Sequence, residues 1–176
     1  VSQTNVATLQ QVISTVTKDA ASVTAANTAI DGSGVANAGN TYTLTTGIDV
    51  LNGSTGNDTF IGSIAPATAS AADQVNGGGG TDTVKIYGGT TLPALTSVEV
   101  VYFNAPGANT NVSAIAGVTN LEIDNDTTGY THTISAAHNV SLTAVSGATV
   151  LTTTATDSSL DLTINGFANA DAAVGL

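Results

Sequence analysis

The chain has 176 residues, of which 13 are acidic and only two, Lys18 and Lys85, are basic, so its formal net charge is −11. Two cations cannot neutralise a phosphate backbone or an anionic lipid surface, and we therefore expect no nucleic-acid partner and no electrostatic attachment to a membrane. Cysteine is absent, which excludes disulfides, thiolate metal sites and thiol nucleophiles, and no run approaches the ~18 apolar residues of a membrane-inserted helix.

Residues 1–32 have the apolar pattern of a helix. Apolar side chains recur at three- and four-residue spacing, which places them on one helical face. They are Val6, Leu9, Ile13, Val16, Ala20, Val23 and Ile30. Asp31-Gly32 supplies a stop signal. We expect an N-terminal helical segment that covers one end of the following structure, links it to an absent domain, or self-associates.

After residue 40 the pattern changes to short strands separated by Gly, Asn and Asp. We expect strands at residues 41–45, 50–51, 59–61, 74–75, 83–87, 98–103, 121–123, 131–134, 140–145, 150–154 and 160–164. In the C-terminal half they recur roughly every 20 residues with no helical segment between them, which is typical of a solenoid. The sequence therefore predicts an all-β fold, a parallel β-solenoid or β-helix of about seven coils. A β-sandwich is the alternative.

One repeated motif carries chemistry. Residues 77–85 (Gly-Gly-Gly-Gly-Thr-Asp-Thr-Val-Lys) match the nonapeptide G-G-x-G-x-D-x-U-x at every defined position, U being a large apolar residue. Residues 53–61 match it with one departure, Ser54 for the second glycine. Each match is preceded by a half-match, Gly47-Ile48-Asp49-Val50-Leu51 or Asp73-Gln74-Val75, whose aspartate lies nine residues before the aspartate of the match. This shared spacing indicates a repeat rather than isolated turns.

Calcium explains the spacing, because it takes six to eight oxygen ligands from carboxylates and backbone carbonyls. Glycines allow positive φ and turn the carbonyls inward, and the aspartate that ends the turn adds charge. The expected metal-site residues are Asp58, Asp82, Asp49, Asp73, Gly53, Gly56, Asn57, Gly77, Gly79 and Thr81. Gly/Asp turns without a metal are the alternative.

Two nonapeptides make one coil of ~18 residues, so each turn stacks on the turn one coil later. The stacked pairs would be Asp58 with Asp82 and Asp49 with Asp73, both 24 residues apart. The excess of six residues over one coil predicts a loop within residues 63–72 that bulges out of the second coil. Asp58 and Asp82 form the stronger expected site, because Asp49 and Asp73 lack the leading glycines.

Two further features are less specific. The acidic cluster Asp124-Asn125-Asp126 could hold another ion, but it has no repeat partner, so we favour a solvated turn. His132 and His138 lie in Thr-rich strand segments and are expected to be exposed. Since neither G-x-S-x-G nor H-E-x-x-H occurs, we do not expect an enzyme.

The repeat region resembles the calcium-binding segment of RTX-type bacterial surface-layer proteins. The resemblance rests on residues 44–53 (Leu-Thr-Thr-Gly-Ile-Asp-Val-Leu-Asn-Gly), residues 56–60 (Gly-Asn-Asp-Thr-Phe) and residues 73–84, followed by Val98-Glu99-Val100. It implies calcium-binding RTX-like β-roll coils at residues 40–90 and a continuing β-solenoid at residues 91–176. It further implies an extracellular structural protein that assembles with its own copies into a lattice on the bacterial cell surface, after type I secretion.

We expect the chain to be a fragment of a longer protein, with the solenoid truncated at residue 176. In such a protein, cell-surface polysaccharide would be contacted by regions outside this chain. The main functional alternative is an RTX adhesin or spacer module that binds ice or another ligand, and a non-catalytic part of a secreted enzyme is a further one. The Thr-x-Thr pairs at residues 41–43, 131–133 and 152–154 are not spaced as a regular ice-binding array.

Overall fold

The computed structural model describes residues 39–63, 65–135, 138–145, 149–154 and 162–167. All of them belong to one compact unit that begins at Gly39. The expected N-terminal helical segment, residues 1–32, lies outside the described residues. So do the first two residues of the expected strand 160–164.

The described residues form 13 strands and are all-β. The strands are β1 (Thr41–Thr43), β2 (Val50–Asn52), β3 (Thr59–Ser63), β4 (Gln74–Asn76), β5 (Thr83–Tyr87), β6 (Ala94–Thr96), β7 (Val100–Asn104), β8 (Thr110–Asn111), β9 (Asn120–Asp124), β10 (Thr131–Ile134), β11 (Asn139–Val145), β12 (Val150–Thr153) and β13 (Leu162–Phe167). The two that the sequence did not predict, β6 and β8, have only three and two residues.

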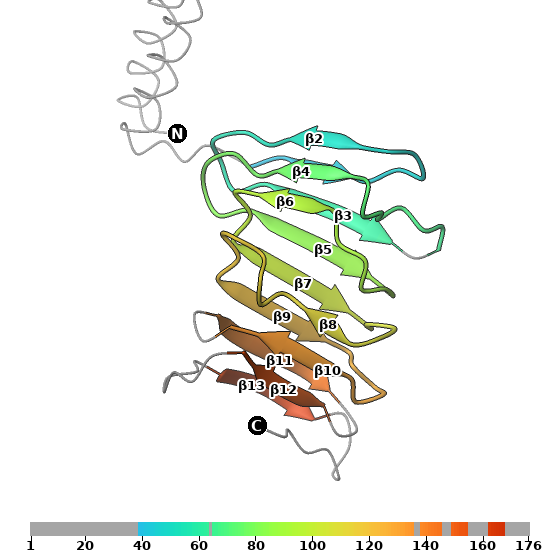
Figure 1. Ribbon diagram of the computed structural model, residues 1–176, viewed down its shortest axis with the longest axis vertical. Coiled ribbons are helices and arrows are strands. Elements are labelled where there is room, and N and C mark those ends of the chain that lie inside the picture. The colour runs from blue at the N-terminus through green and yellow to red at the C-terminus, as the bar shows by residue number, and fades with distance from the viewer. Residues whose placement is uncertain (1–38, 64, 136–137, 146–148, 155–161, 168–176) are drawn as a thin grey trace, which may run out of the picture. The chain divides into compact units, whose positions relative to one another are not determined.

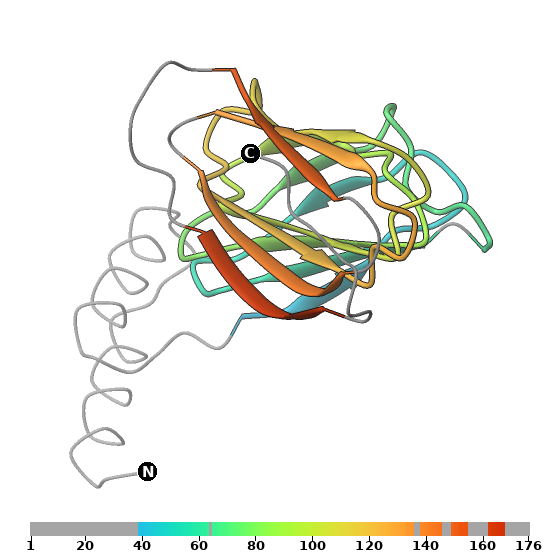
Figure 2. The same cartoon turned by 90° about the horizontal axis from the view of Figure 1, so that it is seen from below.

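The strands build a parallel β-solenoid of about six turns (Figure 1). The odd-numbered strands form one seven-stranded sheet in the order β1-β3-β5-β7-β9-β11-β13, with parallel pairing throughout. The even-numbered strands form two three-stranded sheets, β2-β4-β6 and β8-β10-β12. Seen along the coil axis, the strands lie in two walls on either side of the core (Figure 2). The solenoid prediction is confirmed, with about six turns instead of the expected seven, and the β-sandwich alternative is wrong.

The register confirms the stacking derived from the aspartate spacing. Thr59 pairs with Thr83 in the seven-stranded sheet, and Val50 pairs with Gln74 in the β2-β4-β6 sheet. Both pairs are 24 residues apart, as the aspartates are. The extra residues form a loop between β3 and β4, where the Thr68 amide donates to the Ser63 carbonyl at 2.8 Å. The bulging loop is therefore where the sequence placed it.

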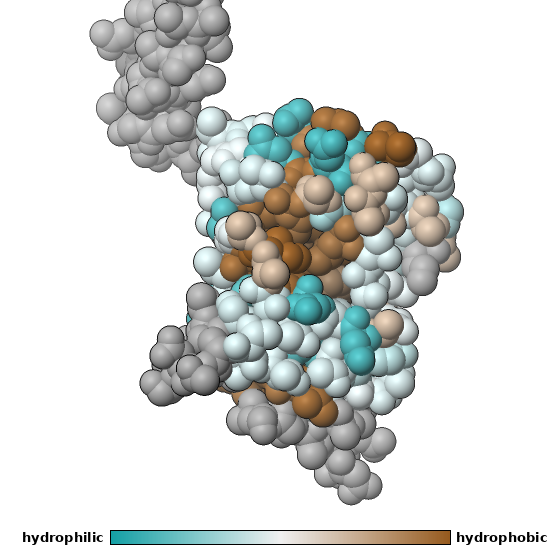
Figure 3. Space-filling model, in the orientation of Figure 1, coloured by the Kyte–Doolittle hydropathy of each residue, from teal (hydrophilic) through white to brown (hydrophobic). Residues whose placement is uncertain are grey.

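Alternation along the strands fills the space between the walls. In β3, β5 and β9 every second residue is buried, as the period of two in a strand requires. The largest fully buried apolar side chains are Phe60, Phe103, Leu44, Ile86, Leu121, Ile123, Ile134 and Leu142. The wall of even-numbered strands is interrupted between β6 and β8, and apolar side chains gather at the surface below β6 (Figure 3).

Candidate metal centre

The structure brings the four predicted aspartates together in their expected pairs. Asp58 and Asp82 directly precede β3 and β5, so the pairing of these strands places one above the other. The Asp58 amide donates to Asp82 Oδ1 at 2.7 Å, and the Asp49 amide donates to Asp73 Oδ1 at 3.0 Å. In both pairs, the carboxylate of one coil accepts a hydrogen bond from the backbone of the preceding coil.

The stack that contains Asp58 and Asp82 is longer than the motif predicted. The Asn40 amide donates to Asp58 Oδ1 at 2.5 Å, and the Asp82 amide donates to Glu99 Oε2 at 2.8 Å. Glu99 directly precedes β7, as the two aspartates precede their strands. We call Asp58, Asp82 and Glu99 the acidic ladder. Sequence reasoning missed Glu99, because the strand expected at residues 98–103 included it, whereas β7 begins one residue after it.

Asp58 is fully supplied with hydrogen-bond donors by its own coil and its neighbour. Oδ2 accepts the Ser54 amide at 2.5 Å, and the Ser54 hydroxyl lies 3.0 Å from Oδ2 and 3.1 Å from Oδ1. Burial alone would raise the pKa of Asp58, but the amides of Asn40 and Ser54 and the Ser54 hydroxyl outweigh it and lower the pKa. Asp58 is therefore held in its charged form by protein donors.

Asp82 has a different environment. Its side chain is 1% exposed, and among the described residues its Oδ2 has no hydrogen-bond partner. Burial raises the pKa of Asp82, and the charges of Asp58 and Glu99 raise it further, against the one amide bond from Asp58. A buried carboxylate oxygen without a donor, between two other carboxylates, is destabilised in a way that a bound cation would relieve.

Two glycines allow the carbonyls of the next coil to approach these carboxylates. A Cβ atom on Gly77 would collide with the Ser97 carbonyl oxygen and with Asp82 Oδ2. A Cβ atom on Gly53 would collide with the Gly77 carbonyl oxygen and lie 2.5 Å from Asp58 Oδ2. Each glycine therefore leaves room for a carbonyl and a carboxylate oxygen side by side, the type of ligand pair that calcium prefers.

Positive φ, which we expected of the motif glycines, occurs in this region at Gly78 and Gly80, with φ of 98° and 110°. The predicted site residues Gly53 and Gly77 serve close approach instead. Gly79 has neither requirement, since a Cβ atom there would meet nothing nearer than Thr55 Cα at 3.6 Å. The reason for a glycine therefore differs from one motif position to the next.

The remaining predicted residues hold the two turns against each other. Asn57 Oδ1 accepts the Thr81 amide at 2.9 Å, and the Gly79 amide donates to the Ser54 carbonyl at 2.9 Å. Gly56 is buried beneath the neighbouring turn, where a Cβ atom on Gly80 would come within 2.8 Å of its carbonyl carbon. These contacts fix the spacing of the coils that carry the carboxylates.

The second aspartate pair is already satisfied by its own loops. Asp49 accepts the Thr45 amide at 2.7 Å and the Thr45 hydroxyl at 3.0 Å. Asp73 Oδ2 accepts the Ser70 amide at 2.7 Å, in addition to the Asp49 amide on Oδ1. This pair is the weaker candidate for a cation, as its missing glycines predicted.

The part of the chain that the structure describes holds no group of three or more His, Cys, Asp or Glu side chains arranged to bind a metal ion. A cation at the acidic ladder would therefore take part of its coordination from backbone carbonyls and water, as calcium does. The fit of the residues to calcium rests on the unpartnered Oδ2 of Asp82 and on the space that Gly53 and Gly77 leave.

The acidic cluster at residues 124–126 is not the solvated turn that we favoured. Asp126 is completely buried and accepts the amides of Thr128, Gly129 and Tyr130 at 2.9–3.1 Å. It also accepts the Thr149 hydroxyl at 2.9 Å. Burial alone would raise the pKa of Asp126, but these hydrogen bonds outweigh it and lower the pKa. Its oxygens are occupied by protein donors.

The prediction that both histidines are exposed is wrong. His132 is 0% and His138 3% exposed. His132 is buried because it alternates with Ile134 on the inner face of β10. His132 Nε2 lies 3.3 Å from Asp126 Oδ2 and Nδ1 lies 2.8 Å from the Thr110 hydroxyl. Burial lowers the pKa of His132, against the effect of Asp126. A neutral ring therefore donates from Nε2 to the carboxylate and accepts the hydroxyl proton at Nδ1.

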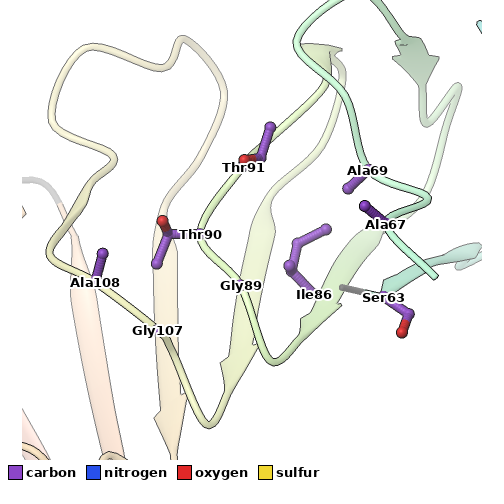
Figure 4. Close-up of a pocket in the computed structure, with 9 residues that line it drawn as sticks. All are labelled: Ser63, Ala67, Ala69, Ile86, Gly89, Thr90, Thr91, Gly107 and Ala108. Carbon is purple, nitrogen blue, oxygen red and sulfur yellow. The ribbon is translucent and has the colours of Figure 1, made fainter. Parts of the chain in front are cut away.

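A mainly apolar pocket lies apart from these polar groups. A cavity of about 220 Å³ is lined by the 63–72 loop, Ile86 and the segments around Gly89 and Gly107 (Figure 4). Its lining has hydroxyls from Ser63 and two threonines but no ionisable side chain. It therefore offers no carboxylate or imidazole to a metal ion and no acid–base pair.

Comparison with known proteins adds no identification: no family model, curated protein or solved structure matches the chain. None of the residues that the structure describes forms a helix with the length and hydrophobicity of a membrane span. The class that the fold defines is a parallel β-solenoid.

Proposed function

We propose that this chain is a structural segment of a bacterial surface layer, and that calcium binding sets its folding and lattice assembly. The observation that carries the proposal is the buried Oδ2 of Asp82, which has no donor in the described part of the chain and belongs to a carboxylate flanked by two others. A divalent cation is the partner that such a group lacks. The spacing of the repeat and its resemblance to RTX-type surface-layer segments support calcium as that cation.

The mechanism follows from charge. Without a cation, the stacked carboxylates repel one another, and the turns that carry them are loosened. Extracellular calcium modules bind with Kd values of ~10⁻⁴–10⁻³ M, so the cytosol leaves them empty and the medium outside fills them. The protein would then pass through a type I secretion system unfolded and acquire its solenoid on the cell surface.

Self-association is supported by the N-terminal edge of the β2-β4-β6 sheet. β2 is an edge strand; its first residue, Val50, is 63% exposed, and Ile48, two residues before it, is 75% exposed. An edge strand with exposed apolar side chains is a template for pairing with another chain. Copies of this chain are therefore the proposed partners, and the proposed location is the extracellular face of the bacterium.

Calcium is expected to raise the melting temperature of the chain by about 3–6 °C per site at a tenfold excess over Kd, since such binding adds about 1.4 kcal/mol. Thermal melts followed by circular dichroism, in EGTA and in millimolar calcium, measure this shift. Magnesium is the control, because it demands a rigid octahedral shell and should produce a smaller shift.

The Asp82→Asn variant sharpens this test. In EGTA it should be at least as stable as the wild type, because the substitution removes a buried charge whose Oδ2 has no donor among the described residues. In calcium it should lose most of the stabilisation that the wild type gains. Melting curves of the wild type that superimpose in EGTA and calcium would contradict the proposed function.

The lattice is tested separately from the binding. Electron microscopy of the protein with calcium is expected to show two-dimensional sheets that disappear when EGTA is added. Isolated rods in calcium would instead favour the alternative, an adhesin or spacer module. That result would leave calcium-dependent folding intact while overturning the surface-layer assignment.

A further inference from the structure

A third coil continues the arrangement that the nonapeptide motif predicts for two. Gly53, Gly77 and Ser97 each directly follow a strand of the β2-β4-β6 sheet, just as each residue of the acidic ladder directly precedes a strand of the opposite wall. The Gly53 amide donates to the Asn76 carbonyl at 2.7 Å, and the Gly77 amide donates to the Thr96 carbonyl at 2.9 Å. The turn from Ser97 to Glu99 is therefore the structural counterpart of the two glycine-rich turns.

The position of Asp82 Oδ2 shows which neighbouring coil it faces. A Cβ atom built on Gly77 would collide with both Asp82 Oδ2 and the Ser97 carbonyl oxygen. Because the two oxygens crowd the same point, they lie close to each other. Ser97 belongs to the coil of Glu99, so the unpartnered oxygen lies on the side of that coil.

Between the coils of Asp58 and Asp82, the carboxylate oxygen in the corresponding position already has hydrogen-bond donors. The equivalent oxygen of the preceding coil, Asp58 Oδ2, accepts both the amide and the hydroxyl of Ser54. The residue that corresponds to Ser54 in the next coil is Gly78, which has no hydroxyl and a φ of 98°. The Asp82 carboxylate therefore lacks the donors that satisfy Asp58.

We propose that a calcium ion is held between the coils of Asp82 and Glu99, by Asp82 Oδ2, the Ser97 carbonyl oxygen and the Glu99 carboxylate. This inference rests on the proposed calcium binding and assigns it a site outside the nonapeptide motif, with Glu99 as a ligand. Carboxylates on both sides and a carbonyl between them are a ligand set suited to calcium.

The shape of the third turn explains why a glutamate stands there. Five positions separate Gly53 from Asp58 and Gly77 from Asp82, but only two separate Ser97 from Glu99. In the shorter turn the backbone changes direction directly after β6. Ser97 there has a φ of 49°, a left-handed conformation that is uncommon outside glycine. The additional methylene of glutamate restores the reach of the carboxylate, which contacts the Asp82 amide at 2.8 Å.

The test is calcium titration of the full chain by isothermal calorimetry, with Glu99→Gln and Glu99→Asp variants. Gln keeps an oxygen that accepts the Asp82 amide but removes the charge, whereas Asp keeps the charge but shortens the reach. Both are expected to weaken one calcium site about tenfold or more, because ligand charge and geometry set calcium affinity. The matched control is Glu122→Gln, on the partly exposed face of β9, which should leave the affinity unchanged.

Two outcomes separate this inference from the proposed function. If the wild type binds calcium and both Glu99 variants bind it with wild-type stoichiometry and affinity, the inference is overturned and the proposed function stands. If Asp58→Asn weakens binding more than Glu99→Gln does, the ion lies between Asp58 and Asp82 and the inference is again wrong. A wild type that binds no calcium overturns both. Melting curves in EGTA show whether each variant is folded.

Discussion

Replacing Gly77 by alanine is expected to destabilise the solenoid by about 3 kcal/mol or more and to weaken calcium binding, whereas Gly79→Ala should be nearly neutral. Both glycines belong to the same nonapeptide and both were predicted as site residues. Only the first has backbone and carboxylate oxygens in the space that a methyl group would occupy.

The cost at Gly77 comes from the stacking of the coils. The added Cβ atom would collide with the Ser97 carbonyl oxygen, a backbone atom that cannot rotate away, and would lie 2.7 Å from Asp82 Cβ. Relief requires the coils to separate, which disrupts the parallel pairing of β4 with β6. At Gly79 the nearest atom, Thr55 Cα, is 3.6 Å from the added atom, an ordinary contact.

Urea unfolding of the two variants and the wild type in EGTA measures this difference without a contribution from calcium. Gly79→Ala controls for the general effect of replacing glycine, which can stabilise a protein by about 0.4–1 kcal/mol through the unfolded chain. Equal midpoints for the two variants would show that the close approach of coils at Gly77 does not exist in solution.

The spacing of the aspartates made the 24-residue register predictable, because two pairs had to be satisfied by one insertion. The register could be predicted only for residues 47–85, because only these residues carry the motif and its half-matches. The turn at Ser97 has neither the glycines nor the length of a nonapeptide, so only the strand pairing reveals that Glu99 belongs to the acidic ladder. The nonapeptide motif does not indicate that the residue directly before β7 stacks on Asp82.

The buried polar network of the C-terminal half was hidden for a different reason. Asp126 lies six residues before His132, but a shared network also needed Thr110 and Thr149, 22 residues before His132 and 23 residues after Asp126. Strand alternation alone would have placed His132 with Ile134 on the inner face. The expectation of exposure rested on the Thr-rich segment around the histidine, whereas the partners that make its burial possible are distant in the sequence.

Asp126→Asn is expected to cost about 3–5 kcal/mol at neutral pH, because its amide nitrogen cannot accept the hydrogen bonds made to one carboxylate oxygen, and each buried donor left without an acceptor costs about 1–3 kcal/mol. The carboxylate receives donors at both oxygens, from three backbone amides, His132 and Thr149. An amide group would place its own N–H donors against some of these. Asp124→Asn is the matched control, since Asp124 is only half-buried and accepts side-chain donors from Tyr102 and Asn104. It should cost about 1 kcal/mol or less.

The pH dependence identifies the carboxylate as the cause. The pKa of Asp126 is lowered from its ordinary value of 3.8, so its contribution is present above that value and is lost as the pH falls below it. The stability gap between wild type and Asp126→Asn should therefore be constant from neutral pH to about 5 and narrow below about 4.

Acid also acts through His132, whose pKa is lowered from 6.5. The unfolded chain binds this proton more readily than the native state, so the stability of the wild type should begin to fall below about pH 6.5. Urea midpoints in saturating calcium between neutral pH and about pH 3.5 measure both effects, and Asp124→Asn should follow the wild type. If the gap for Asp126→Asn did not change on acidification, its cost would come from altered packing rather than from the loss of a buried carboxylate, because packing does not titrate.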